Sequence, residues 1–182
     1  MERKTFLQLS MIAPLAAAAN AQGQNPKKGF KIEAGKDRFQ EELHIMGGQF
    51  NCVVSGQDTG GELCIYNTFR QEKGGPAFHL HHSQDEWFFV VSGEFIIKIG
   101  DDTFNLKAGD SAFAPRTIPH AFAKVNEGDA HMLVLFQPAG TMEDFFKQMS
   151  KVTTEVVKDP QTRLKELHAS HGMQVVGPPL KV

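Results

Sequence analysis

A chain of 182 residues, of which 41% are hydrophobic, has the size of one domain and can bury a core. Its formal charge is −2 and it has no long run of either sign, so neither nucleic acid nor an anionic membrane is an expected partner. Small molecules are the expected partners. The 17 glycines fall between short apolar runs, which is typical of a protein with many strands and turns.

Residues 1–21 have the features of a secretory signal peptide. Arg3 and Lys4 precede an apolar stretch, residues 6–19, that is too short to cross a bilayer. Ala19 and Ala21 then supply the small residues of a cleavage site. We expect cleavage after Ala21, export to the periplasm and no membrane span in the mature protein. The alternative is an amphipathic helix at the start of the mature protein.

The central part of the chain has the pattern of an all-β domain. Residues 22–41 are polar and predict a flexible lead-in. Within residues 42–140, apolar runs such as 95–97 alternate with Gly and Asp turns such as Gly109-Asp110. This pattern predicts one antiparallel barrel or sandwich, and the chain is too short for a second barrel.

The strand predicted at residues 86–91 is apolar on both faces after Glu86, although a sheet with one face in water should alternate. One face can line the barrel interior. The other must pack against the flank of the second sheet, the C-terminal helices or a partner subunit, and we expect a homodimer.

Residues 141–182 predict two short helices and a tail packed on the barrel. The first helix starts near Thr141 and extends to about Lys151. The second has Asp159 as its N-cap and Pro160 in its first turn, and ends before Gly172. The two prolines at 178–179 predict an extended terminus that cannot be a central strand.

Cys52 and Cys64 lie in adjacent predicted strands. In an oxidising compartment they can form a disulfide, but each can equally be a small buried side chain. The sequence leaves both alternatives open.

The clearest chemical signal is the pair His79 and His81. Residues two apart on a strand share a face, so both rings can reach one point while Leu80 turns away. Glu86 would face the opposite side of an unbroken strand. The polar segment 82–85 therefore predicts a corner, after which Glu86 can point back at the same spot.

A third histidine, His120, follows Pro115 and Pro119, whose fixed φ angles place it at the start of a new strand. His82 lies in the polar corner and is interpreted as a solvated side chain. The remaining histidines lack a partner at ligand spacing and are interpreted as surface or core residues: His44, His131, His168 and His171.

Two stretches of the sequence resemble the two motifs of the cupin superfamily, with the short spacing of bacterial cupins that have one barrel. They are His79-x-His81-x4-Glu86-x6-Gly93, and Gly109-x5-Pro115 with Pro119-His120. The resemblance implies a jelly-roll barrel, an antiparallel double-stranded β-helix. It also implies one divalent transition metal per subunit, with His79, His81, Glu86 and His120 as the metal ligands. Thr117 stands where the second motif usually has glycine, and Lys124 where it often has asparagine.

Imidazole and carboxylate ligands suit Fe, Mn, Co, Ni, Cu or Zn, and the sequence does not choose among them. Such a ligand set leaves positions open for an organic oxygen or dioxygen, and Glu86 is also the candidate catalytic base for an enol or phenol. The tail at 171–180 looks like that of small cupins related to quercetin 2,3-dioxygenase. The resemblance implies a dioxygenase acting on an aromatic or enolisable small molecule. The alternatives are a non-catalytic small-molecule-binding cupin, or a metal-dependent isomerase or decarboxylase.

An apolar, partly aromatic cavity is expected beside the metal, because inward-facing strand positions are hydrophobic. The expected lining residues are Phe88, Val90, Phe95, Ile97, Phe122 and Met132 or Leu133. Only three basic residues lie in or beside strands near the site, which argues against carboxylate or phosphate substrates. They are Arg70, Lys98 and Arg116.

Overall fold

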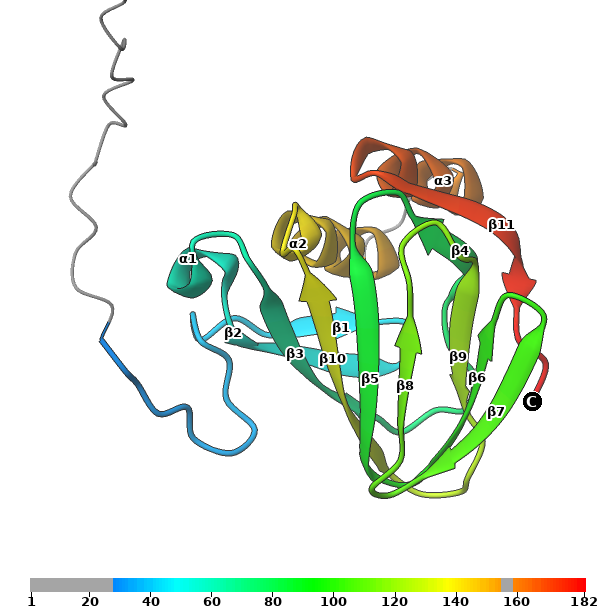
Figure 1. The fold of residues 1–182 in the computed structure, drawn as a ribbon, viewed down its shortest axis with the longest axis horizontal. Helices are drawn as coiled ribbons and strands as arrows, with labels where there is room; N and C mark the ends of the chain where they lie inside the picture. The colour runs from blue at the N-terminus through cyan, green and yellow to red at the C-terminus, as the bar shows by residue number, and fades with distance from the viewer. Residues whose placement is uncertain (1–27, 155–158) are drawn as a thin grey trace, which may run out of the picture.

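The computed structural model describes residues 28–154 and 159–182 (Figure 1). The predicted signal peptide, residues 1–21, lies outside the described residues. No helix in the described ranges is long and apolar enough to cross a bilayer.

Two antiparallel sheets form the barrel, and the predicted all-β jelly roll is confirmed (Figure 1). In order across the first sheet, the strands are β1 (Leu43–Ile45), β2 (Gly48–Val54), β3 (Cys64–Arg70), β10 (Ala130–Gln137), β5 (Asp85–Ser92) and β8 (Ser111–Ala114). Those of the second sheet are β11 (Met173–Pro179), β4 (Ala77–His81), β9 (His120–Lys124), β6 (Glu94–Ile99) and β7 (Asp102–Lys107).

Strict alternation of side chains turns one face of each central strand into the barrel. On β10, Met132, Val134 and Phe136 are buried, and the residues between them face outward. On β5 the inward face is fully buried, while Trp87 and Phe89 on the outward face are half-buried and stack with ring centroids 5.7 Å apart. Both faces of β5 are therefore apolar, and the outward one lies on the surface of the subunit.

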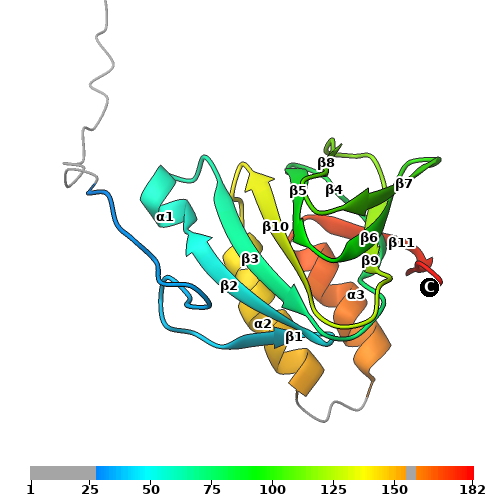
Figure 2. The same cartoon turned by 90° about the horizontal axis from the view of Figure 1, so that it is seen from below.

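The two predicted C-terminal helices are present. They are α2 (Met142–Thr154) and α3 (Pro160–Ser170), and a short helix, α1 (Gly56–Thr59), precedes β3. Asp159 caps α3 by accepting a hydrogen bond from the Thr162 N–H at 3.1 Å. Helices α2 and α3 lie side by side across the same end of the barrel (Figure 2).

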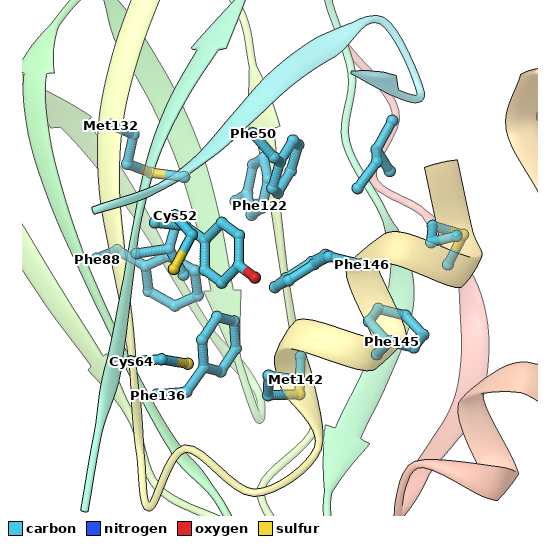
Figure 3. Close-up of a cluster of buried hydrophobic side chains, with 14 of the residues drawn as sticks. Phe50, Cys52, Cys64, Phe88, Phe122, Met132, Phe136, Met142, Phe145 and Phe146 are labelled. Atoms are coloured by element: carbon cyan, nitrogen blue, oxygen red, sulfur yellow. The ribbon is translucent and has the colours of Figure 1, made fainter. Parts of the chain in front are cut away.

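One apolar stripe attaches α2 to the barrel. Met142, Phe145, Phe146 and Met149 follow the i, i+3, i+4, i+7 spacing of one helix face, and all four are buried. Figure 3 shows Phe146 turned from the helix toward the aromatic side chains of the strands, whereas Phe145 packs against Phe146 and against His168 of α3, with ring centroids 5.3 and 5.0 Å apart. The helix therefore forms a wall over the open end of the barrel.

The extended C-terminal tail is a strand, β11, which joins the second sheet at its edge. Met173 pairs with His81 and Val175 with His79, and the register becomes irregular toward the prolines. An edge position suits these prolines, because they have no N–H to donate to a further strand. The tail thereby flanks the strand that carries the two spaced histidines.

Cys52 and Cys64 are buried free thiols in neighbouring strands (Figure 3). Burial raises the pKa of both, that of Cys64 to about 12, so neither is a reactive thiolate near neutral pH. Close to Cys52, the buried carboxylate of Asp37 accepts hydrogen bonds from the N–H groups of Phe39 and Cys52 at 2.7 and 2.6 Å. These bonds attach the segment before β1 to strand β2.

Candidate metal centre

The structure brings the four predicted ligands together from three strands. His79 and His81 face inward on β4, His120 is the cross-strand partner of His79 on β9, and Glu86 comes from β5 in the opposite sheet. The chain turns between His81 and Asp85, as the polar corner predicts. One potential ligand atom from each of the four buried side chains lies within 4.8 Å of the others.

Backbone carbonyl groups orient two of the imidazole rings. The Nδ1 atom of His79 is 2.8 Å from the Ala77 carbonyl oxygen, and that of His120 is 2.9 Å from the Ile118 carbonyl oxygen. A carbonyl oxygen can only accept, so each Nδ1 carries the proton and donates it. This leaves the Nε2 atom of each ring available to a metal ion, the usual arrangement of metal-binding histidines.

His81 has both ring nitrogens buried without a hydrogen-bond partner in the described part of the chain. Its Nε2 atom is 3.2 Å from Glu86 Oε2, but the two groups are not aligned for a hydrogen bond. A buried polar group without a partner costs about 1–3 kcal/mol. A transition-metal ion would satisfy this nitrogen, and three imidazoles with one carboxylate are a donor set that such ions accept.

The charges of the cluster are coupled. Burial alone would raise the pKa of Glu86, but the hydrogen bond from His120 Nε2, at 2.7 Å, and the closeness of His81 hold it below its usual range. Burial and the two neighbouring imidazoles lower the pKa of His79 to about 3. Burial also acts to lower the pKa of His120, yet the hydrogen bond to Glu86 raises it. His79 is thus neutral near pH 7, whereas Glu86 favours a proton on His120 with which a metal ion would compete.

The two departures from the cupin motifs have structural roles near the site. Thr117 has a φ of 68°, a conformation that favours glycine, and its N–H donates to the His81 carbonyl oxygen at 2.7 Å. Lys124 is buried, and its Nζ donates to the carbonyl oxygens of Gln71 and Asn126 at 2.9 and 2.8 Å. Both residues shape connections around the four ligands without displacing one.

A cavity of about 570 Å³ adjoins the cluster, and His79, His81 and Glu86 line it. Its barrel wall is apolar and includes Phe50, Phe122, Val134 and Phe136. Its helical wall includes Met149 of α2 and Leu164 of α3, together with Phe145 and Phe146 of α2, which are labelled in Figure 3. The volume lies within the range of roughly 300–1,000 Å³ that is usual for small-molecule sites.

The predicted lining was mostly wrong, since only Phe122 of those residues lines the cavity. Phe122 packs against Phe88 and Phe95 with ring centroids 6.0 and 6.2 Å apart. The barrel interior on that side of Phe122 is therefore filled with side chains, and the free space lies between the barrel and the helices. Three more residues of the predicted lining are buried in the barrel core and not in the cavity wall: Val90, Ile97 and Met132. Leu133 lies on the outward face of β10.

His168 is the residue that the sequence interpretation missed. It lies on α3, is buried, lines the cavity, and its ring centroid is 5.9 Å from that of His79. Its Nδ1 is 2.6 Å from the Leu164 carbonyl oxygen, to which it donates. Local spacing could not reveal this, because His168 reaches the cavity only through the packing of α3 against the barrel.

The other histidines lie as predicted. His82 is exposed in the corner. His131 stacks on Phe69, and His171 contacts Thr141 and Gln148 at the start and middle of α2. None of these three lines the cavity.

Residues 68–136, from β3 to β10, match the cupin domain family. This part of the chain is therefore similar to cupin domains. All four clustered side chains lie within the matched segment. Among curated proteins, an uncharacterized protein of Streptomyces coelicolor is 39% identical over 57 residues, which are 31% of this chain. The match spans 53% of that protein, so this chain corresponds to about half of its length.

Several solved structures are similar to the barrel of this chain. An RmlC-like cupin from Shewanella frigidimarina is 25% identical, with a TM-score of 0.48, over 63% of this chain and 96% of that one. A predicted oxalate decarboxylase from Thermotoga maritima is 16% identical, with a TM-score of 0.49, over 54% and 90% of the two chains. A sugar phosphate isomerase from Silicibacter pomeroyi is 18% identical, with a TM-score of 0.46, over 59% and 69%.

Proposed function

We propose that this cupin is a metal-dependent dioxygenase that acts on an aromatic or enolisable small molecule. The observation that carries the proposal is the position of the buried three-histidine, one-glutamate cluster at the wall of a cavity of about 570 Å³. A divalent transition metal (Fe, Mn, Co, Ni, Cu or Zn) held by such a set supplies open positions for an organic oxygen or dioxygen.

The chain's own residues have separate tasks in this proposal. His79, His81, His120 and Glu86 would hold one metal ion per subunit. Glu86 is the one carboxylate among the described residues that line the cavity, so it is the candidate to accept the proton of an enol or phenol. The aromatic rings of Phe50, Phe122 and Phe136 exclude water and offer faces to a flat molecule.

Measurement of oxygen consumption by metal-reconstituted protein, across a panel of phenolic and enolic compounds, tests the proposal. We expect uptake with some of them and none in metal-free protein. Glu86→Gln should lower turnover more than metal content, because it removes the base as well as a charged ligand. Tight binding without oxygen uptake would instead identify a non-catalytic binding cupin. Turnover that persists without oxygen would identify an isomerase or decarboxylase.

We also propose that the protein is exported to the periplasm and forms a homodimer. Export is supported by the basic start, the short apolar run and the small residues before the predicted cleavage position after Ala21. Dimer formation is supported by an outward aromatic patch, in which Phe113 on β8 is 55% exposed and lies opposite Trp87 of β5. Intact-mass analysis of natively produced protein tests the first proposal, and light scattering tests the second.

A further inference from the structure

The cavity contains a buried cation that the metal cluster does not use. Arg70 ends β3, is 3% exposed and lines the cavity. Its Nη2 donates to the Met46 carbonyl oxygen at 2.6 Å, while its Nε is buried without a partner in the described part of the chain. A guanidinium group has five N–H donors in a planar fork, so most of the donors of Arg70 remain for another acceptor.

The charge of Arg70 is poorly compensated within the protein. No carboxylate of the described residues forms an ion pair with it, and Glu72 is the acidic group that acts on it electrostatically. Burial lowers the pKa of Arg70, and Glu72 offsets this only in part. An anion in the cavity would offset the cost of burying this charge, because buried charges require a paired and hydrogen-bonded partner.

The other charges along the cavity favour an anion too. Lys165 of α3 lines it, and Glu86, its one carboxylate among the described residues, belongs to the metal cluster. Lys98 and Arg116 do not line the cavity, since Lys98 lies over the Phe78 ring and Arg116 pairs with Asp85. Of the three basic residues noted in the sequence, only Arg70 can meet a ligand there, and its place in the cavity lining removes the sequence-based argument against a carboxylate substrate.

Arg70 and the four-residue metal cluster lie at different places along the barrel wall of the cavity. The Arg70 guanidinium carbon is 5.6 Å from the centroid of the Phe122 ring. Phe122 is two residues beyond His120 on β9, which is about 6.6 Å along a strand. A single molecule that lies along the Phe122 ring can therefore reach both the cluster and Arg70.

We propose that Arg70 binds a carboxylate of the substrate, and that the substrate is an aromatic or enolisable carboxylic acid whose opposite end faces the metal cluster. The second half of this statement rests on the proposed function, whereas carboxylate binding by Arg70 does not. The planar guanidinium group of an arginine can donate two parallel hydrogen bonds to the two oxygens of one carboxylate. The surroundings are otherwise apolar and favour a monoanion over a phosphate dianion, which would need more donors.

The test is a comparison of paired probes with the same skeleton, 4-phenylbutyrate and its neutral amide, and the pair formed from 3-phenylpropionate. Calorimetric titrations use metal-free and zinc-loaded protein, so that oxygen chemistry cannot contribute. We expect the carboxylates to bind about tenfold more tightly than the amides in both forms. Arg70→Gln should abolish this preference, and Arg70→Lys, which keeps the charge without the fork, should retain part of it. Arg116→Gln, whose parent side chain lies outside the cavity, should keep all of it.

Several results would overturn the proposal. These are equal binding of acid and amide, no binding of any probe, or a preference that survives in Arg70→Gln. A preference that needs zinc would place the carboxylate on the metal, and one lost only in Lys165→Gln would place it on α3. If Arg70→Gln does not fold, as judged by its thermal transition, Arg70→Lys decides by a several-fold fall in the preference. None of these results depends on oxygen uptake, so the two proposals can fail separately.

Discussion

The barrel wall and the helical wall of the cavity are built on different principles. The barrel wall carries the four-residue cluster on β4, β5 and β9, where backbone carbonyl groups orient the rings of His79 and His120. The helical wall of α2 and α3 is mostly apolar and is held by aromatic packing. Local spacing along β4 therefore places two of the four clustered side chains, whereas the long-range packing of the helices determines the space for a substrate.

Removal of a barrel-wall ligand has the largest expected effect. In His81→Ala and His120→Ala, metal affinity should fall by more than about 100-fold, since even partners outside the ligand set are worth 10- to 100-fold. Elemental analysis after dialysis measures the bound metal. The control is His82→Ala, whose parent side chain is exposed one residue away. Full metal content in the first two variants would refute the ligand assignment.

Damage to the helical wall should reduce stability without reducing metal binding. The ring of Phe146 lies 5.1, 4.6 and 5.7 Å from the rings of Phe50, Tyr66 and Phe136. Phe146→Ala should therefore lower the free energy of unfolding by about 3–5 kcal/mol, measured with denaturant. Phe104→Ala, at a position 45% exposed, is the control and should cost less than about 0.5 kcal/mol. Loss of metal from the folded fraction of Phe146→Ala would show that the two walls are coupled.

Metal binding to the barrel wall should release a proton at pH values below the raised pKa of His120. The pKa of His120 is raised, so its ring is protonated in the metal-free protein below that pKa, and the metal must displace the proton. Affinity should therefore fall as the pH drops through this range, by up to about tenfold per pH unit. Calorimetry in buffers of different ionisation enthalpy counts the protons. A binding enthalpy that is independent of the buffer would contradict the assignment of the proton to His120.

The smallest expected effect concerns the turn before β9. Thr117 has a positive φ, which costs a residue with a side chain about 1–2 kcal/mol of folding free energy. Glycine avoids this cost, but it loses more conformational entropy on folding, which offsets part of the stabilisation. Thr117→Gly should therefore stabilise the protein by up to about 1 kcal/mol, read as a higher thermal midpoint. The same change at Thr103, on exposed strand β7, should destabilise it. Destabilisation by Thr117→Gly would show that the side chain of Thr117 is needed there.

The two walls also differ in how far the sequence predicts them. The two-residue spacing of His79 and His81 is a local property of a strand, and the corner that returns Glu86 follows from the polar residues between the strands. His120 is far along the chain, and only the resemblance to the cupin motifs joined it to the other three. The start of α3 could be predicted because the N-cap Asp159 and Pro160 in the first turn are local signals in the sequence.

The position and lining of the cavity could not be predicted from the sequence in the same way. Alternation separates inward from outward side chains, but it does not show which end of a barrel is filled, and so Phe88 and Phe95 were wrongly placed in the lining. His168 reaches the site through the packing of α3, which no spacing near residue 168 indicates. Arg70 was noted as a basic residue near the site, but its burial without an ion-pair partner among the described residues is a property of the folded protein alone.

Crystallographic anomalous scattering from protein reconstituted with one divalent transition metal tests the central claim most directly. We expect one anomalous peak per subunit, about 2.0–2.2 Å from the Nε2 atoms of His79, His81 and His120 and from a carboxylate oxygen of Glu86. The peak should border the cavity beneath α2 and α3. A fully occupied peak at other histidines, or none between these four side chains in metal-loaded crystals, would contradict the account.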